Sequence, residues 1–176
     1  MPEVPAIPRA AQLTDATVEA FASDGALAQT LEGFEARAGQ VEMAEAVAAV
    51  LADGGVLLAE AGTGTGKTLA YLVPAILSRK RVLVSTGTKN LQEQIFFKDL
   101  PVLRDALGVP FTATCMKGRG NYLCLHRFET FRETAAIRSW DETHHIRILE
   151  RWLADTETGD RAEVEDLPED LPFWND

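Results

Sequence analysis

The sequence predicts an α/β fold in which a parallel sheet is covered by helices on both faces. Two short aliphatic runs, at residues 56–58 and 81–86, lack the polar alternation of a half-exposed strand and are typical of strands buried inside a parallel sheet. Each run is followed by a polar turn and then by a helical pattern, at residues 69–77 and 91–100. With 176 residues, 46% of them apolar, the chain is long enough to build such a core.

The helical segments carry clear start and stop signals. Residues 34–53 place Met43, Ala46, Val47, Val50 and Leu51 on one helical face, and glycines follow at 54 and 55. Pro74 is expected to kink the next helix, because proline lacks a backbone donor. A third strand is expected at residues 111–116 and another amphipathic helix at 141–153. Before residue 34 the pattern indicates a helix that is broken near Gly25.

The composition limits the setting in which the protein works. No apolar stretch approaches the roughly 18 residues of a membrane span, and the first ten residues lack the order of a signal peptide. Two cysteines are too few for a disulfide scaffold. We therefore expect a cytoplasmic protein with no membrane partner, and a monomer.

The net charge of −10 is unevenly distributed along the chain. Residues 37–132 carry twelve basic and eight acidic residues, whereas the segments on either side are strongly acidic. A basic section between acidic flanks is compatible with a polyanionic ligand, although an excess of four charges is weak evidence alone.

The most informative motif is a glycine-rich loop between the first predicted strand and its helix. Glycines allow backbone N–H groups to surround phosphate oxygens, and the helix adds its positive N-terminal end. Lys67 is expected at the β- and γ-phosphates, and the Thr68 hydroxyl at Mg²⁺. This is a Walker A arrangement, except that alanine replaces its first glycine. The predicted loop contains Ala61, Gly62, Thr63, Gly64, Thr65, Gly66, Lys67 and Thr68.

Upstream of this loop stand three residues whose side chains suit a nucleotide base. Phe34 offers a ring for stacking, and Arg37 and Gln40 offer several hydrogen-bonding groups. From spacing alone, an ordinary place for Gln40 in the first helical turn is an equal alternative.

Two polar segments are candidates for contacts with single-stranded nucleic acid. The first combines short donors with a lysine, and in the second basic and aromatic residues alternate. A capped helix with a polar face remains the alternative for the first, and Thr88 is its expected cap. The candidate residues are Thr86, Thr88, Lys89, Asn90 and Gln94 in the first segment, and Lys117, Arg119 and Tyr122 in the second.

Four stretches in order, FEARAGQVEM, EAGTGTGKTLAYLVPA, STGTKNLQEQIFFKDLP and KGRGNYLCLHR, resemble the DinG/YoaA branch of the XPD-like superfamily-two DNA helicases. The likeness implies an amino-terminal extension at residues 1–33, the first part of a RecA-like ATP-binding motor domain at 34–116, and the start of a helical iron–sulfur domain at 117–176. It implies an ATP- and Mg²⁺-dependent helicase of 5′ to 3′ polarity, connected with DNA repair or replication, that acts on single-stranded or forked DNA.

The resemblance also assigns roles to single residues. It implies that Arg37 and Gln40 bind adenine, that alanine is usual at position 61, and that Thr86, Thr88 and Gln94 hold the translocating strand. Cys124 resembles the first of four cysteines that bind a [4Fe–4S] cluster, whereas Cys115 aligns with no ligand and the chain has no further cysteine.

Parts that a helicase needs for turnover do not occur in these 176 residues. We find no Walker B Asp-Glu pair and no second motor domain, so we expect an amino-terminal piece that does not hydrolyse ATP by itself. A stand-alone protein that binds nucleotide or single-stranded DNA without turnover is the alternative. A small-molecule kinase is a third, but it would need a lid with arginines within this length.

Overall fold

The computed structural model describes residues 10–134, 140–164, 167, 168, 171 and 174. They form two compact units, residues 1–115 and 116–176, each with its own hydrophobic core.

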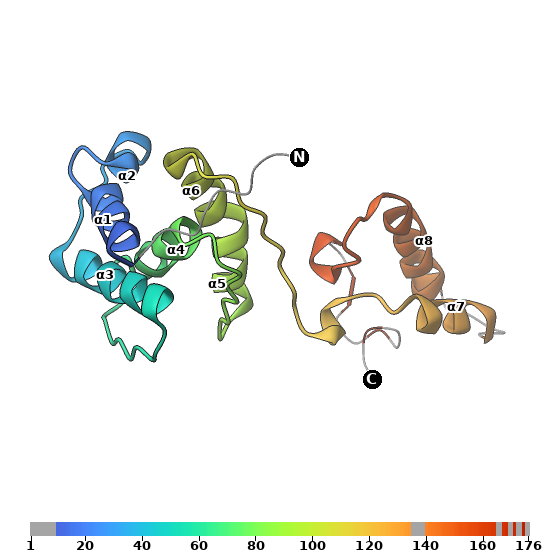
Figure 1. The fold of residues 1–176 in the computed structure, drawn as a ribbon. Helices are drawn as coiled ribbons and strands as arrows, with labels where there is room; N and C mark the ends of the chain where they lie inside the picture. Colours follow the sequence, from blue (N-terminus) through green and yellow to red (C-terminus); the bar gives the residue numbers. More distant parts are fainter. Residues whose placement is uncertain (1–9, 135–139, 165–166, 169–170, 172–173, 175–176) are drawn as a thin grey trace, which may run out of the picture. The chain divides into compact units, whose positions relative to one another are not determined.

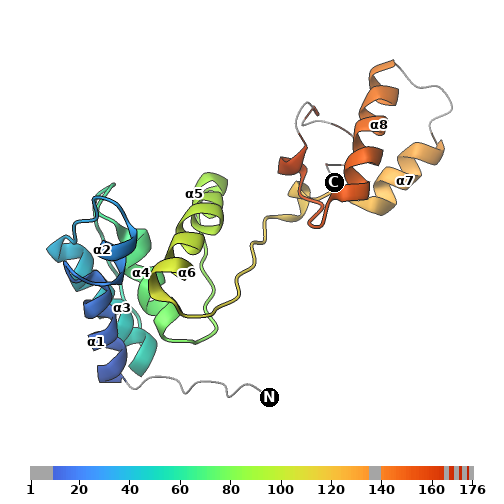
Figure 2. The same ribbon diagram turned by 90° about the horizontal axis from the view of Figure 1, so that it is seen from above.

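The first unit is built from helices (Figures 1 and 2). Their bounds are α1 (Ala10–Phe21), α2 (Ala26–Thr30), α3 (Ala38–Asp53), α4 (Lys67–Leu77), α5 (Lys89–Gln94), the π-helical segment η1 (Ile95–Asp99) and α6 (Leu100–Leu107). As predicted, the chain breaks between Phe21 and Ala26 and α3 stops at Gly54.

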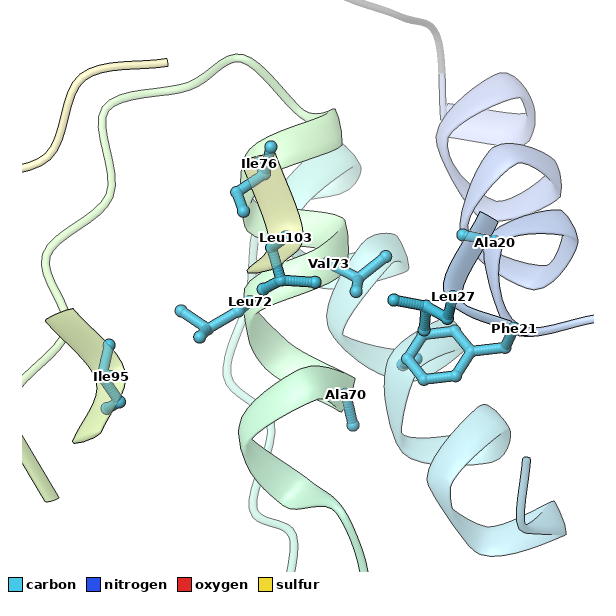
Figure 3. Packing of buried hydrophobic residues seen from close by; sticks show 10 residues of the cluster. Ala20, Phe21, Leu27, Ala70, Leu72, Val73, Ile76, Ile95 and Leu103 are labelled. Atoms are coloured by element: carbon cyan, nitrogen blue, oxygen red, sulfur yellow. The ribbon is translucent and has the colours of Figure 1, made fainter. Parts of the chain in front are cut away.

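Helix α4 lies at the centre of this unit. Helices α1 and α3 both pack against it, and α3 also packs along α1. Figure 3 shows α4 between Phe21 and Leu27 on one side and Ile95 on the other, with Val73 directed toward the first pair and Leu72 toward Ile95. The segment before residue 34 therefore contributes to the same core as the helix that follows the glycine-rich loop.

The contact face of α3 is narrower than the sequence predicted. Its fully buried apolar residues are Ala44 and Ala48, whereas the expected Met43, Val47 and Leu51 are only half-buried. Small side chains let two helices approach closely, so the alanines take the contact line and the larger residues lie beside it. Helix α4 continues through Pro74, which is itself buried.

The predicted parallel sheet is not confirmed. Within the described residues, the segments 56–61, 81–86 and 111–116 are extended but form no β-ladder. Leu58 and Leu83 are each 93% exposed. A parallel strand requires a hydrogen-bonding neighbour and cover on both faces, and the described part of the chain supplies neither to these segments.

The second unit contains η2 (Arg119–Asn121), α7 (Leu125–Thr134), α8 (Trp140–Asp155) and the 3₁₀ turn η3 (Arg161–Glu163). Its core is formed by Phe128, Ile146, Leu149, Leu171 and Trp174. The predicted helix at 141–153 is confirmed, with Ile146 and Leu149 buried. Trp174 near the end of the chain is only 4% exposed and lies 6.5 Å from Trp152 between ring centroids; Phe173 lies outside the described residues.

Candidate nucleotide site and nucleic-acid surface

The glycine-rich loop connects the extended segment 56–61 to α4 and turns sharply at two glycines. Gly64 has φ +76°, and Gly66, the N-cap of α4, has φ +81° and ψ +21°. Both angles lie in the left-handed region that glycine adopts without strain. Ala61 has no positive φ, so the missing first glycine of the motif is not required by the backbone here.

The Lys67 ammonium lies over this loop. Its Nζ donates to the carbonyl oxygens of Ala61 at 2.7 Å and Gly62 at 2.6 Å. The Thr65 hydroxyl donates to the Gly62 carbonyl at 2.9 Å. The lysine is therefore held at the loop rather than extended into solvent, and Thr68 lies half-buried in the next position of the first turn of α4.

Arg37 and Gln40 contact the loop from the start of α3. The Arg37 guanidinium donates to the Gly64 carbonyl, and Gln40 Nε2 donates to the Gly66 carbonyl at 3.0 Å. Gln40 is only 6% exposed. The Gly66 carbonyl also accepts the first hydrogen bond of α4, from the Ala70 N–H at 3.2 Å, so both of its acceptor positions are used.

These carbonyl bonds have a consequence for the N–H groups of the loop. In a trans peptide the C=O and the following N–H point in opposite directions. Fixing the carbonyls of Gly64 and Gly66 from the α3 side therefore directs the N–H groups of Thr65 and Lys67 away from α3. Outward-directed N–H groups at a helix N-terminus form an anion site.

Phe34, the third residue predicted to bind the base, belongs partly to the core. Its ring is half-buried, and its centroid lies 6.3 Å from that of Phe21. The structure thus brings Arg37 and Gln40 to the phosphate loop, while Phe34 contacts α1.

The first candidate segment for nucleic acid lies at the start of α5. The Thr88 hydroxyl accepts from the Leu91 N–H at 3.3 Å, which confirms the predicted cap, and the Thr86 hydroxyl donates to the Thr88 carbonyl. Lys89, Asn90 and Gln94 are exposed on the helix. The Gln94 amide donates to the Asp99 carboxylate at 3.3 Å. Burial raises the pKa of Asp99, whereas the Gln94 hydrogen bond and the Lys98 charge act in the opposite direction.

The second candidate segment belongs to the second unit, where part of it is used in packing. Lys117 Nζ lies 2.6 Å from the Asp160 carboxylate, and its side chain is only 5% exposed. The Lys117 N–H donates to the Tyr122 hydroxyl at 2.8 Å. Arg119 is exposed at the start of η2. The ion pair joins residues 43 positions apart, which no local pattern could have indicated.

A carboxylate that the sequence did not single out organises the chain after α8. Glu163 accepts from the hydroxyls of Thr156 at 2.6 Å and Thr158 at 2.5 Å, and from Trp152 Nε1 at 3.1 Å. Hydrogen bonds from Thr156 and then Thr158 hold the pKa of Glu163 below its ordinary value of 4.5. The cluster connects η3 to the end of α8.

The cysteines do not form a cluster site within this chain. Cys115 and Cys124 belong to different compact units, and Cys124 is exposed immediately before α7. Among the described residues, no group of three or more His, Cys, Asp or Glu side chains is arranged to hold a metal ion. One thiolate does not fit a four-iron cluster, which requires about four protein ligands.

No helix in the described part of the chain is long and apolar enough to cross a membrane.

Comparison with known proteins gives a consistent result. Residues 42–118 match the DEAD/DEAH box helicase family. The chain is 41% identical over 153 residues to the ATP-dependent DNA helicase YoaA of Haemophilus influenzae, and 40% identical over 154 residues to the protein of that name from Escherichia coli. These matches cover 87% and 88% of this chain and 24% of each relative. It is also 38% identical over 150 residues to the 3'-5' exonuclease DinG of Bacillus subtilis, covering 81% of this chain and 16% of the relative. The chain thus spans about a quarter, or less, of the length of these relatives.

Proposed function

We propose that the parent protein is an ATP-dependent DNA helicase, and that these residues supply its ATP-binding loop and part of its DNA-binding surface. The support is the match of residues 42–118 to the DEAD/DEAH box helicase family and the similarity to proteins named YoaA and DinG. The observation that carries the proposal is the position of Lys67, held over a loop whose N–H groups are directed outward at the start of α4. The RecA-like parallel sheet is part of the same proposal, with the extended segments 56–61 and 81–86 as its strands.

Each part of the loop has a definite task in binding ATP. The N–H groups of residues 64–68 and the positive end of α4 bind the phosphate oxygens. Lys67 provides a positive charge that exchanges its bonds to the Ala61 and Gly62 carbonyls for phosphate oxygens. The Thr68 hydroxyl would supply one of the hard oxygen ligands that Mg²⁺ prefers, and a bound ion would offset the negative charge of the phosphates.

The base and the DNA strand are assigned to neighbouring residues. The Gly66 bond uses one N–H of the Gln40 amide, and we assign its oxygen and its second N–H to adenine. Residues 86–90 and Gln94 bind phosphates of a single strand that passes the end of segment 81–86. In the second unit Arg119 is the exposed member of the second candidate segment and is assigned to the DNA strand, whereas the Lys117 side chain is 5% exposed and paired with Asp160. Movement along the strand is assigned 5′ to 3′ polarity from the resemblance.

The iron–sulfur cluster enters only through one residue. We assign Cys124 as a single thiolate ligand whose partners this chain does not contain. The chain's own residues therefore do not hold the cluster.

The decisive experiment is DNA-stimulated ATP hydrolysis by the full-length gene product. We expect Lys67→Ala to abolish turnover, because the cation at the phosphates is lost. Lys80→Ala removes the same charge from a lysine that bonds the Leu51 carbonyl, away from the loop, and should retain activity. ATPase that survives the first change, or is equally lost with the second, would contradict the proposal.

A further inference from the structure

An aromatic ring stands exposed on the helix that begins at the candidate DNA segment. Phe97 is 66% exposed, although its neighbours Ile95 and Phe96 are buried and half-buried. The Phe96 and Phe97 rings meet edge to face, with centroids 5.1 Å apart and an interplanar angle of 89°. This contact supports the Phe97 ring on one side and leaves most of it accessible to a ligand.

The helix is irregular around Phe97. Pro101 has no N–H, and its ring would clash with the Phe97 carbonyl in a regular α-helix. The clash is avoided because the helix widens into the π-helical segment η1, in which the Leu100 N–H donates to the Ile95 carbonyl five residues earlier. Such widened turns occur frequently at functional sites. With α5 before it and α6 after it, the position of Phe97 on the helix is well fixed.

Between residues 89 and 99 the exposed polar side chains are cations and amides. Lys89, Asn90, Gln94 and Lys98 are exposed, whereas the nearby acids Glu93 and Asp99 are half-buried. The Asp99 carboxylate is bonded by the Gln94 amide. The surface around Phe97 therefore has the charge that suits a polyanion rather than an apolar protein surface.

We propose that Phe97 stacks on a nucleobase of the single-stranded DNA bound at residues 86–90. The inference rests on the proposed function, because it assumes that the strand passes along α5. A helix rises about 1.5 Å per residue, which puts Phe97 about 13 Å beyond the Thr88 cap. A strand whose phosphates are held at the cap and by Lys89 thus continues over the ring. A ring flanked by lysines and amides binds any base, because every base offers a π-face.

The test compares two ligands on the full-length gene product, measured by fluorescence anisotropy. One is a single-stranded oligonucleotide, and the other is an abasic oligomer of the same length that retains every phosphate. We expect Phe97→Ala to weaken binding of the first roughly tenfold and to leave the second unchanged. Lys98→Ala is the matched control, because losing a phosphate contact should weaken both ligands to a similar extent. Phe97→Trp should keep the affinity, and its emission in excess of that of the parent protein should be quenched by the oligonucleotide but not by the abasic oligomer.

Other outcomes would overturn the inference in distinguishable ways. Equal binding of the oligonucleotide by Phe97→Ala and the parent protein would show that the ring touches no base. A second outcome would also overturn the inference: the indole of Phe97→Trp emits as a buried group without DNA, and Phe97→Ala lowers the melting temperature. Position 97 would then be covered by another part of the full-length protein. If the unsubstituted full-length protein bound neither ligand, the proposed function itself would fail and the ring would have no strand to stack on.

Discussion

The Gly66→Ala substitution probes two features of the loop at once. Gly66 has φ +81°, and a Cβ added there would lie 2.1 Å from Gln40 Nε2 and 2.7 Å from its Cδ. The left-handed backbone costs alanine about 1–2 kcal/mol, and displacing the Gln40 amide forfeits a hydrogen bond that contributes about 1 kcal/mol. We therefore expect the free energy of unfolding to fall by about 2–3 kcal/mol.

Neighbouring glycines provide matched controls in the same denaturant-unfolding assay. Gly64 has φ +76° but no atom within 4 Å of an added Cβ, so Gly64→Ala should show the backbone strain alone, about 1–2 kcal/mol. At Gly62 the backbone is unstrained and the nearest atom is 3.9 Å away, so alanine should change stability by less than about 0.5 kcal/mol.

A double-mutant cycle separates the clash from the strain. Gln40→Ala alone should cost about 1 kcal/mol, because the Gly66 carbonyl loses a donor. In the Gly66→Ala/Gln40→Ala protein the amide is already absent, so the double mutant should be about 1 kcal/mol more stable than the sum of the single changes predicts. Strictly additive losses would refute the reasoning, since they would mean that the amide and the added methyl group do not meet.

The remaining predictions concern the second unit. Because the folded-state pKa of Glu163 is lowered, its contribution to stability is present above its unfolded value near 4.5 and is lost as the pH falls through the folded value. Thr156→Val removes the first cause of the shift and should flatten the pH dependence of the melting temperature as the pH falls below 4.5; an unchanged slope would exclude Glu163 as the titrating group. For Cys124, iron and sulfide analysis of the full-length gene product should show loss of the cluster in Cys124→Ser and retention in Cys115→Ser, and an intact cluster in the first variant would remove Cys124 from the ligand set.

Features that depend on neighbouring residues could be predicted from the sequence. The Thr88 cap, the stop at Gly54 and the break before Ala26 follow from local backbone chemistry, and all three are found. The π-helical segment also had a local signal, Pro101 inside a helical pattern, which sequence reasoning did not use. The sheet was a different kind of prediction. Aliphatic runs at 56–58 and 81–86 indicate burial on two faces, but pairing depends on other strands, and the described residues offer none.

The roles of Arg37 and Gln40 show why a site is harder to predict than a helix. Their spacing from the loop indicated a nucleotide ligand, but spacing along the chain does not determine which atom a long side chain reaches. Gln40 lies 26 residues before Gly66 in sequence and still bonds its carbonyl, because α3 packs against α4. The close approach of these two helices thus places an amide under the loop. The same packing that forms the core therefore fixes the direction of the N–H groups on which phosphate binding depends, and a larger residue at position 44 or 48 should disturb both.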